Sequence, residues 1–163
     1  MTAQQLDNLI YQQAKKRGAS DALARLVVQM ARHETGNYSS KVFLENNNAF
    51  GYKYVKGAKW QSGAGRMSPE GNNYARYRSV NDSVNEVMDW MARREKQGLF
   101  KMNSLTDSTA FANALKSGNY YGAPVSQYKR GLDAADDKIV IAAAGGLAGL
   151  LVVAGLIVLY NRK

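Results

Sequence analysis

The chain has 163 residues, 45% of them hydrophobic, so it can hold one compact domain with its own core. It has no cysteine and one histidine, which excludes disulfide bonds and thiol catalysis and leads us to expect neither a metal site nor a cofactor. A net charge of +9 favours an anionic partner, but the basic residues are scattered and match no nucleic-acid-binding motif, so we expect no nucleic-acid partner.

The first 35 residues predict two amphipathic helices. In residues 3–17, apolar residues at steps of four form one face, and Gly18 stops the helix. These residues are Leu6, Ile10 and Ala14. In residues 21–35, Ser20 or Asp21 can cap the helix. Its apolar face is formed by Leu23, Val27, Met30 and Ala31.

Glu34 continues the apolar face of the second helix. It follows Met30 by four residues and Val27 by seven, so its carboxylate should point toward the packed side. Burying a lone carboxylate raises its pKa, and a carboxyl group protonated near neutral pH is what a general acid requires. The alternative is that Glu34 ends the helix and turns to solvent. His33 lies on another side, at a helix end that favours its cation, and we assign it no catalytic role.

A small β lobe is expected after the second helix. Residues 50–55 and 58–61 are predicted to form two short strands, and residues 74–78 alternate like a third. Ser79 with Asp82 resembles a capping box for a helix that ends at Gly98. Its apolar face is formed by Val84, Val87, Met88 and Met91. A last helix is predicted at about 107–117, and the whole indicates an α+β domain with a cleft between its lobes.

Residues 139–160 carry no charge and are rich in Ala, Val, Leu, Ile and Gly. The run is long enough to cross a hydrocarbon core of about 30 Å at about 1.5 Å per residue, which predicts a transmembrane helix. A buried helix of the domain fits poorly because the segment is apolar on all sides. Gly145 and Gly149 form a Gly-x-x-x-Gly pair that could support weak homo-association through lipid-embedded helices.

Flanking charges suggest an orientation for this segment. Three aspartates precede it and two basic residues follow it, which places the C-terminus in the cytoplasm and the N-terminal domain outside. Residues 1–18 are charged and lack an apolar run, so they do not predict a signal peptide. We therefore expect a domain at 1–132, an acidic juxtamembrane linker at 133–138, a single transmembrane helix at 139–160 and a basic tail at 161–163.

Four short motifs follow one another along the chain. They are Glu-Thr-Gly-Asn-Tyr-Ser-Ser from Glu34, Asn-Asn-Asn-Ala-Phe-Gly-Tyr-Lys at 46–53, Tyr-Ala-Arg-Tyr-Arg-Ser at 74–79 with Ser83 behind it, and Tyr120 with Pro124. In this order they resemble the flagellar-type and autolysin-type endo-β-N-acetylglucosaminidases, glycoside hydrolase family 73 of the lysozyme-like superfamily. The resemblance covers roughly residues 20–130. The chain has Gly122-Ala123 where that family tends to have Thr-Asp.

The resemblance implies a mainly helical, lysozyme-like domain that cleaves β-1,4 bonds in the glycan strands of peptidoglycan. Glu34 would protonate the leaving oxygen. Glu70 lies in the loop where the family carries its second glutamate, although it could be only a solvated turn residue, and Glu45 is the alternative. Tyr120 would orient the substrate N-acetyl group or the attacking water.

We expect polar and aromatic residues near these carboxyl groups to bind the substrate. The candidates are Asn47, Asn48, Tyr52, Tyr74 and Tyr121. Asn47 and Asn48 should also brace their loop through hydrogen bonds to the backbone. Tyr121 and Tyr128, in contrast to Tyr120, are expected to be packing or sugar-stacking residues.

Together these features predict a membrane-anchored peptidoglycan hydrolase, whose basic charge suits anionic wall polymers. A hydrolase with a C-terminal anchor would suit the virion of a membrane-containing bacteriophage, where it would open the wall during infection. Two other functions stay open. One is a lytic transglycosylase that uses Glu34 alone, and the other is a non-catalytic wall-binding or structural membrane protein.

Overall fold

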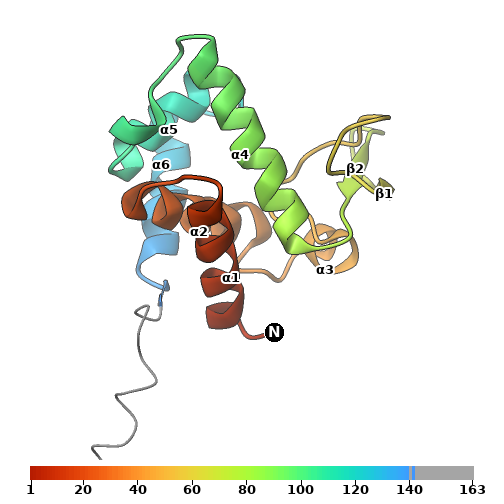
Figure 1. Ribbon diagram of the computed structural model, residues 1–163. Helices are drawn as coiled ribbons and strands as arrows, with labels where there is room; N and C mark the ends of the chain where they lie inside the picture. The colour runs from red at the N-terminus through yellow and green to blue at the C-terminus, as the bar shows by residue number, and fades with distance from the viewer. Residues whose placement is uncertain (140, 142–163) are drawn as a thin grey trace, which may run out of the picture.

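The computed structural model describes residues 1–139 and residue 141 (Figure 1). The described part is mainly helical and contains one small antiparallel sheet, so the predicted fold class is confirmed for these residues. Its elements are α1 (Ala3–Lys16), α2 (Asp21–Thr35), α3 (Lys41–Asn46), β1 (Gly63–Met67), β2 (Asn73–Arg76), α4 (Val80–Lys96), a short 3-10 helix η1 (Met102–Ser104), α5 (Ser108–Ser117) and α6 (Val125–Asp136).

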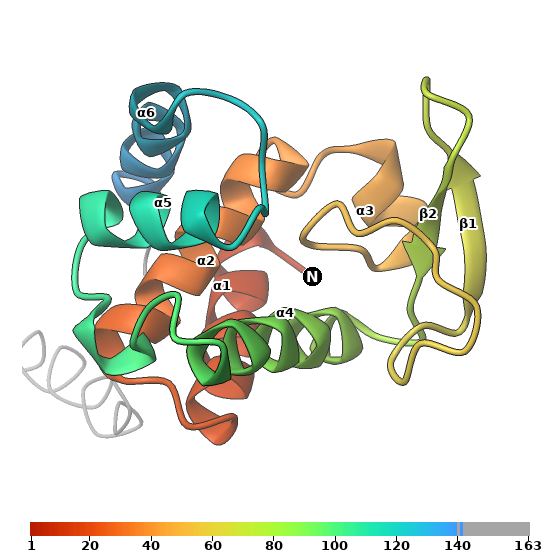
Figure 2. The same ribbon diagram turned by 90° about the horizontal axis from the view of Figure 1, so that it is seen from above.

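The sheet and α3 lie at one end of the domain, and α5 and α6 lie at the other (Figure 2). Helix α2 runs through the middle and packs against α1 and α6, while α1 also packs against α4. The small β lobe contacts α3, which packs against both of its strands. This arrangement places the C-terminal end of α2 between the two ends of the molecule.

Helices α1 and α2 form as their apolar spacing predicts, and all seven predicted core positions are buried. The Ser20 hydroxyl caps α2 by accepting a hydrogen bond from the backbone N–H of Leu23 at 3.1 Å. Gly36 ends the helix in the left-handed region with φ of 57°. Asn37 and Tyr38 continue in the same region with φ of 58° and 66°. Two such non-glycine residues in succession need external support.

A buried ion pair gives that support. The Arg32 guanidinium binds both carboxylate oxygens of Asp7, with Nε to Oδ1 at 2.8 Å and Nη2 to Oδ2 at 2.5 Å. Arg32 also donates to the Asn37 side chain at 3.3 Å, and the Tyr38 hydroxyl donates to Asp7 at 2.7 Å. The pair therefore joins α1, α2 and the left-handed turn that directly follows Glu34.

The β lobe differs from its predicted form. Residues 50–55 make a single isolated bridge, Lys53 with Tyr74, and residues 58–61 form no strand. Two glycines adopt left-handed backbone conformations, Gly51 near the start of this segment with φ of 66° and Gly57 just beyond its end with φ of 80°. These conformations stop the segment from extending into a ladder of strand pairs. The third predicted strand is confirmed as β2, and its partner is β1.

The later helices follow their capping signals. The Ser79 hydroxyl accepts from the backbone N–H of Asp82 at 3.3 Å and donates to its carboxylate at 3.0 Å, so the predicted N-cap of α4 is confirmed. Asp107 caps α5 by accepting from two backbone N–H groups of the first turn. Helices α3 and α6 were not predicted. Pro124 precedes α6, which buries Tyr128, Leu132 and Ala135.

Helix α6 continues beyond residue 132 into the segment that the sequence suggested as a linker. Asp136 accepts hydrogen bonds from Arg25 and Gln29, each at 2.8 Å, and Asp133 pairs with Lys129 at 2.5 Å. Residues 133–136 are therefore helical and bound to the domain. The predicted transmembrane helix, the Gly145 and Gly149 pair within it and the basic tail lie outside the described residues, apart from Ile139 and Ile141. Among the described residues, none of the helices is both long and apolar enough to span a bilayer.

The buried ion pair generates a stability prediction. Asp7→Ala should lower the free energy of unfolding by about 3–5 kcal/mol, because it leaves the Arg32 cation buried without its partner. Urea denaturation of the full chain measures the loss. Asp21→Ala is the matched control, since it removes an exposed pair with Lys15 and should change little. Equal effects of the two variants would contradict the structural importance of the buried pair.

Candidate active site

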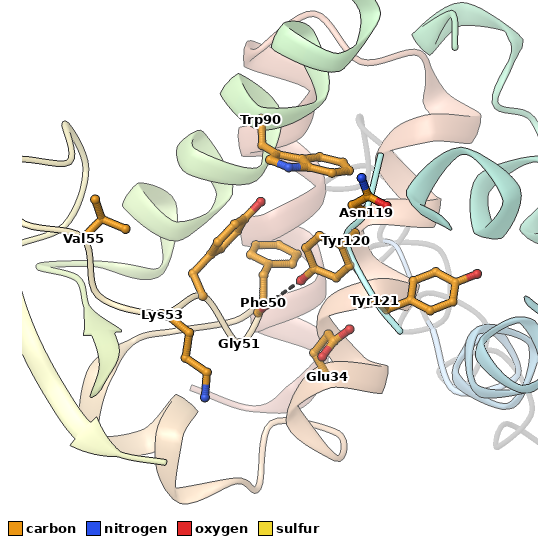
Figure 3. Close-up of a pocket in the computed structure, with 10 residues that line it drawn as sticks. Glu34, Phe50, Gly51, Lys53, Val55, Trp90, Asn119, Tyr120 and Tyr121 are labelled. Atoms are coloured by element: carbon orange, nitrogen blue, oxygen red, sulfur yellow. Dashed lines mark hydrogen bonds between the residues drawn. The ribbon is translucent and has the colours of Figure 1, made fainter. Parts of the chain in front are cut away.

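A cavity of about 460 Å³ opens beside the C-terminal end of α2 (Figure 3). Four parts of the chain enclose it: α2, the segment after α3, α4, and the loop between α5 and α6. The residues that line it are Glu34, Phe50, Gly51, Tyr52, Lys53, Val55, Trp90, Asn119, Tyr120 and Tyr121. Among them Glu34 carries the only carboxyl group, so it is the candidate acid of this cavity.

Glu34 is half-buried and lies on the packed side of α2, as its place in the helix pattern predicts. Its Oε1 accepts a hydrogen bond from the Tyr128 hydroxyl at 2.6 Å. Its Oε2 faces Gly51, where a β-carbon would lie 3.6 Å away. Burial raises the pKa of the Glu34 carboxyl, and the hydrogen bond from Tyr128 opposes that rise.

Aromatic side chains form one wall of the cavity. The rings of Tyr52 and Trp90 both meet the ring of Tyr120 edge to face, with centroids 5.9 Å and 5.4 Å away. The Tyr120 hydroxyl donates to the carbonyl oxygen of Phe50, which joins the loop after α5 to the segment after α3 (Figure 3). Gly118 makes room for the wall, because a β-carbon there would lie 2.7 Å from Trp90. Such surfaces suit the apolar faces of sugar rings.

The Tyr52 hydroxyl is buried and has no hydrogen-bond partner within the described structure. Burial raises the pKa of Tyr52 well above its ordinary value, so this phenol stays neutral and can donate. A buried donor without a partner is costly to the folded chain. Tyr52 lines the cavity, while its hydroxyl is shielded from solvent.

The candidates for a second carboxylate do not line the cavity. Glu70 lies in the turn between β1 and β2, with 67% of its side chain exposed, and pairs with Lys53 at 3.3 Å. Hydrogen bonds from Ser68, from its own backbone and from Lys53 lower the pKa of Glu70, which keeps it ionised. Because Lys53 does line the cavity, this pair is the link between Glu70 and the site. Glu45 lies on α3 and pairs with Arg66 at 3.2 Å.

Three of the predicted substrate-binding residues lie elsewhere in the β lobe. Asn47 donates to the Tyr77 carbonyl at 3.2 Å, and Asn48 donates to the carbonyls of Tyr52 at 2.9 Å and Ala75 at 3.0 Å. Both asparagines therefore brace their loop, as expected, and neither lines the cavity. Tyr74 lies under the Lys53 ammonium, 3.9 Å from ring centroid to nitrogen, and is also absent from the lining.

Tyr121 lines the cavity and stacks on Tyr128, with ring centroids 3.9 Å apart. The structure thus brings together four of the predicted site residues: Glu34, Tyr52, Tyr120 and Tyr121.

Two contributors to this site are not among the predicted site residues. Trp90 was not singled out, although it falls on the buried face of α4 between Val87 and Met91. Tyr128 was assigned to packing or sugar stacking, because α6 was not predicted. The apolar spacing of α6, with Tyr128 and Leu132 four residues apart, was the available signal.

His33 occupies a packed position behind the site. Its ring meets the edge of Tyr128 with centroids 4.8 Å apart, and a β-carbon at Gly131 would lie 2.1 Å from its Cε1. Burial lowers the pKa of His33, against the expectation that the helix end would favour its cation. The described residues contain no cluster of three or more acidic or histidine side chains that could hold a metal ion.

The comparisons with known proteins agree with this architecture. The glucosaminidase family model, described as mannosyl-glycoprotein endo-beta-N-acetylglucosaminidase, matches residues 9–139. A solved peptidoglycan hydrolase from Sphingomonas sp. A1 is similar at 23% identity, with a TM-score of 0.61 over 86% of this chain and 96% of that one. A chain from a type VI secretion system effector–immunity complex of Pseudomonas protegens is similar at 16% identity, with a TM-score of 0.63 over 84% and 90%.

These structural likenesses confirm the predicted hydrolase fold. No curated protein matches the sequence at a significant level.

The raised pKa of Glu34 generates a prediction about stability. The folded chain binds the Glu34 proton more tightly than the unfolded chain, so the stabilisation is complete below the unfolded pKa and is lost as pH rises through the folded pKa. Glu34→Gln stays neutral throughout. The melting temperature of the variant should therefore rise relative to that of the unchanged chain as the pH increases above the ordinary glutamate pKa of 4.5. Thermal unfolding followed by circular dichroism measures the difference.

Glu70→Gln serves as the control for this measurement. The pKa of Glu70 is lowered in the folded chain, so the same substitution there should give a small effect of opposite sign. A melting-temperature difference for Glu34→Gln that is constant with pH would show that the carboxyl group is not shifted.

Proposed function

The chain belongs to the glucosaminidase family, and on that premise we propose that it cleaves the β-1,4 glycosidic bonds of peptidoglycan as an endo-β-N-acetylglucosaminidase. The observation that carries the proposal is the half-buried Glu34 carboxyl, with its raised pKa, in a cavity that has an aromatic wall. The similar protein from Sphingomonas sp. A1 is a peptidoglycan hydrolase, which supports this substrate class.

In the proposed reaction Glu34 is the general acid. Burial raises its pKa, which favours the protonated form that a general acid requires. In that form it would protonate the leaving oxygen as the bond breaks toward an oxocarbenium-like transition state. The aromatic wall of Tyr52, Trp90 and Tyr120 would take the face of a sugar ring.

Glu70 is the proposed second carboxylate. Its lowered pKa keeps it ionised, as a nucleophile or a base requires, and the contrast with Glu34 is the usual division between two carboxyl groups of a glycosidase. The turn that carries Glu70 is exposed, so a bound glycan strand could draw it over the cavity. Tyr120 is the candidate for orienting the substrate N-acetyl group or the attacking water.

One observation favours a second candidate, a lytic transglycosylase. Glu70 is largely exposed and does not line the cavity, which leaves Glu34 as the single carboxyl group there. A transglycosylase would use the N-acetyl group of the substrate in place of a second carboxylate and would leave an anhydro sugar.

The two candidates differ in the chemical ends that they release from purified peptidoglycan. We expect the full chain to release reducing N-acetylglucosamine ends, identified by mass spectrometry. Glu34→Gln should lower the rate roughly 10²- to 10⁴-fold, because it removes the acid. Glu70→Gln should also lower the rate strongly if Glu70 is the second carboxylate. Asp21→Asn, at an exposed ion pair outside the cavity lining, serves as the control.

Each other outcome points to a different function. Anhydro-muramic ends with full activity in Glu70→Gln would move the assignment to a transglycosylase, and reducing muramic ends would move it to a muramidase. No release from several wall types would contradict an enzyme and leave a non-catalytic wall-binding or structural protein.

We also propose that residues 139–160 anchor the domain in a membrane, with the domain on the outer side. The support is the uncharged apolar run and the charges that flank it. A wall hydrolase held in this way would suit the virion of a membrane-containing bacteriophage. Absence of the protein from purified particles would contradict the virion assignment.

The anchor generates its own prediction. Leu150→Arg places a charge near the middle of the apolar run, which costs about 2.5–3.5 kcal/mol of insertion free energy, so the protein should leave alkali-washed membranes. Leu44→Arg is the matched control, because Leu44 is an exposed residue of the domain. Equal membrane retention of both variants and the unchanged chain would contradict the anchor.

A further inference from the structure

We propose that Tyr128 is a positioning residue that gives the two oxygens of Glu34 different tasks. Oε1 accepts the hydrogen bond of Tyr128, and Oε2 carries the proton that passes to the substrate. This inference rests on the proposed function of Glu34 as the acid, and it adds which oxygen acts and which residue selects it.

The hydrogen bond reaches Glu34 from behind the cavity. Tyr128 is on α6, is 5% exposed and does not line the cavity. Its hydroxyl lies 2.6 Å from Oε1 of Glu34, while Oε2 faces Gly51, which does line the cavity. A protonated carboxyl group has one O–H and one C=O. When Oε1 accepts from Tyr128 as the carbonyl oxygen, the proton lies on Oε2, on the substrate side.

Packing fixes the ring that delivers this bond. Tyr128 stacks on Tyr121 with an interplanar angle of 5° and meets His33 edge to face at 87°. His33 in turn packs against the backbone of α6 at Gly131, where only a glycine leaves room for its ring. The ring is thus enclosed on two sides by residues of the domain, and its hydroxyl points at Glu34.

The other titratable and charged groups near Glu34 do not compete for this role. Tyr120 donates to the Phe50 carbonyl, and the Tyr52 hydroxyl has no partner within the described structure. Lys53 lines the same cavity and pairs with Glu70. Burial and the nearby Glu34 charge raise the pKa of Tyr128 far above neutrality, so its hydroxyl stays protonated and able to donate.

Tyr128→Phe tests the proposal, because it removes the hydroxyl and keeps the stacked ring. The hydrogen bond favours ionised Glu34, so its loss should raise the pKa of Glu34 and move the basic limb of the pH–kcat profile to higher pH. At the optimum, kcat should fall up to about 100-fold because the acid is no longer held in line. KM should hold, since Tyr128 lies outside the cavity lining.

Infrared spectroscopy gives a second readout that needs no activity. The C=O stretch of protonated Glu34, identified by its absence in Glu34→Gln, should move to higher frequency in Tyr128→Phe, because the carbonyl loses its hydrogen bond. Tyr11→Phe is the matched control, since it removes a phenol–carboxylate bond at the exposed Asp21. It should leave the band and the kinetics unchanged. Thermal unfolding of the full chain checks that both variants fold.

The outcomes separate this inference from the proposed function. An unshifted C=O band in Tyr128→Phe would overturn the inference, because it would place the carbonyl on Oε2. A raised KM with unchanged kcat and pH profile would also overturn it, since Tyr128 would then serve binding. Full activity of Glu34→Gln would instead overturn the proposed function, while the infrared band would still decide which oxygen carries the proton.

Discussion

A carboxyl group partly removed from water at the end of a helix is the constraint on which the rest of this structure depends. Glu34 follows a run of buried residues in α2, so the packing that stabilises the helix also desolvates its last acidic side chain. The backbone beyond it enters a left-handed turn, which the buried pair of Asp7 and Arg32 supports. The domain thereby holds in place a group whose ionisation it opposes, as functional sites often do.

The fold places the two carboxyl groups in contrasting environments. Glu34 lies where α2, α4 and the loop before α6 meet, and burial dominates its pKa. Glu70 lies in the exposed turn of the β lobe, where hydrogen bonds and Lys53 dominate. Environments that push two carboxyl groups apart in pKa favour an acid and an ionised partner in one reaction. Trp90 and Tyr120 supply apolar surface in the cavity beside Glu34.

Much of the helical framework could be predicted from the sequence, because periods of three and four residues, capping residues and terminal glycines are local signals. The position of Glu34 followed from the same periodicity. The β lobe was harder, since Gly63–Met67 reads Gly-Ala-Gly-Arg-Met and lacks the β-branched and aromatic residues that mark strands. The contact of Tyr128 with Glu34 could not be predicted for another reason. This hydrogen bond joins residues 94 positions apart in the sequence and depends on how α6 packs on α2.

The most direct test of this account is the titration of the Glu34 carboxyl group by 13C NMR, with its resonance assigned through Glu34→Gln. The account predicts a midpoint above the ordinary glutamate pKa of 4.5, because burial outweighs the hydrogen bond from Tyr128. A midpoint at or below that value would show a carboxylate that is ionised at neutral pH, and Glu34 could not then be the general acid.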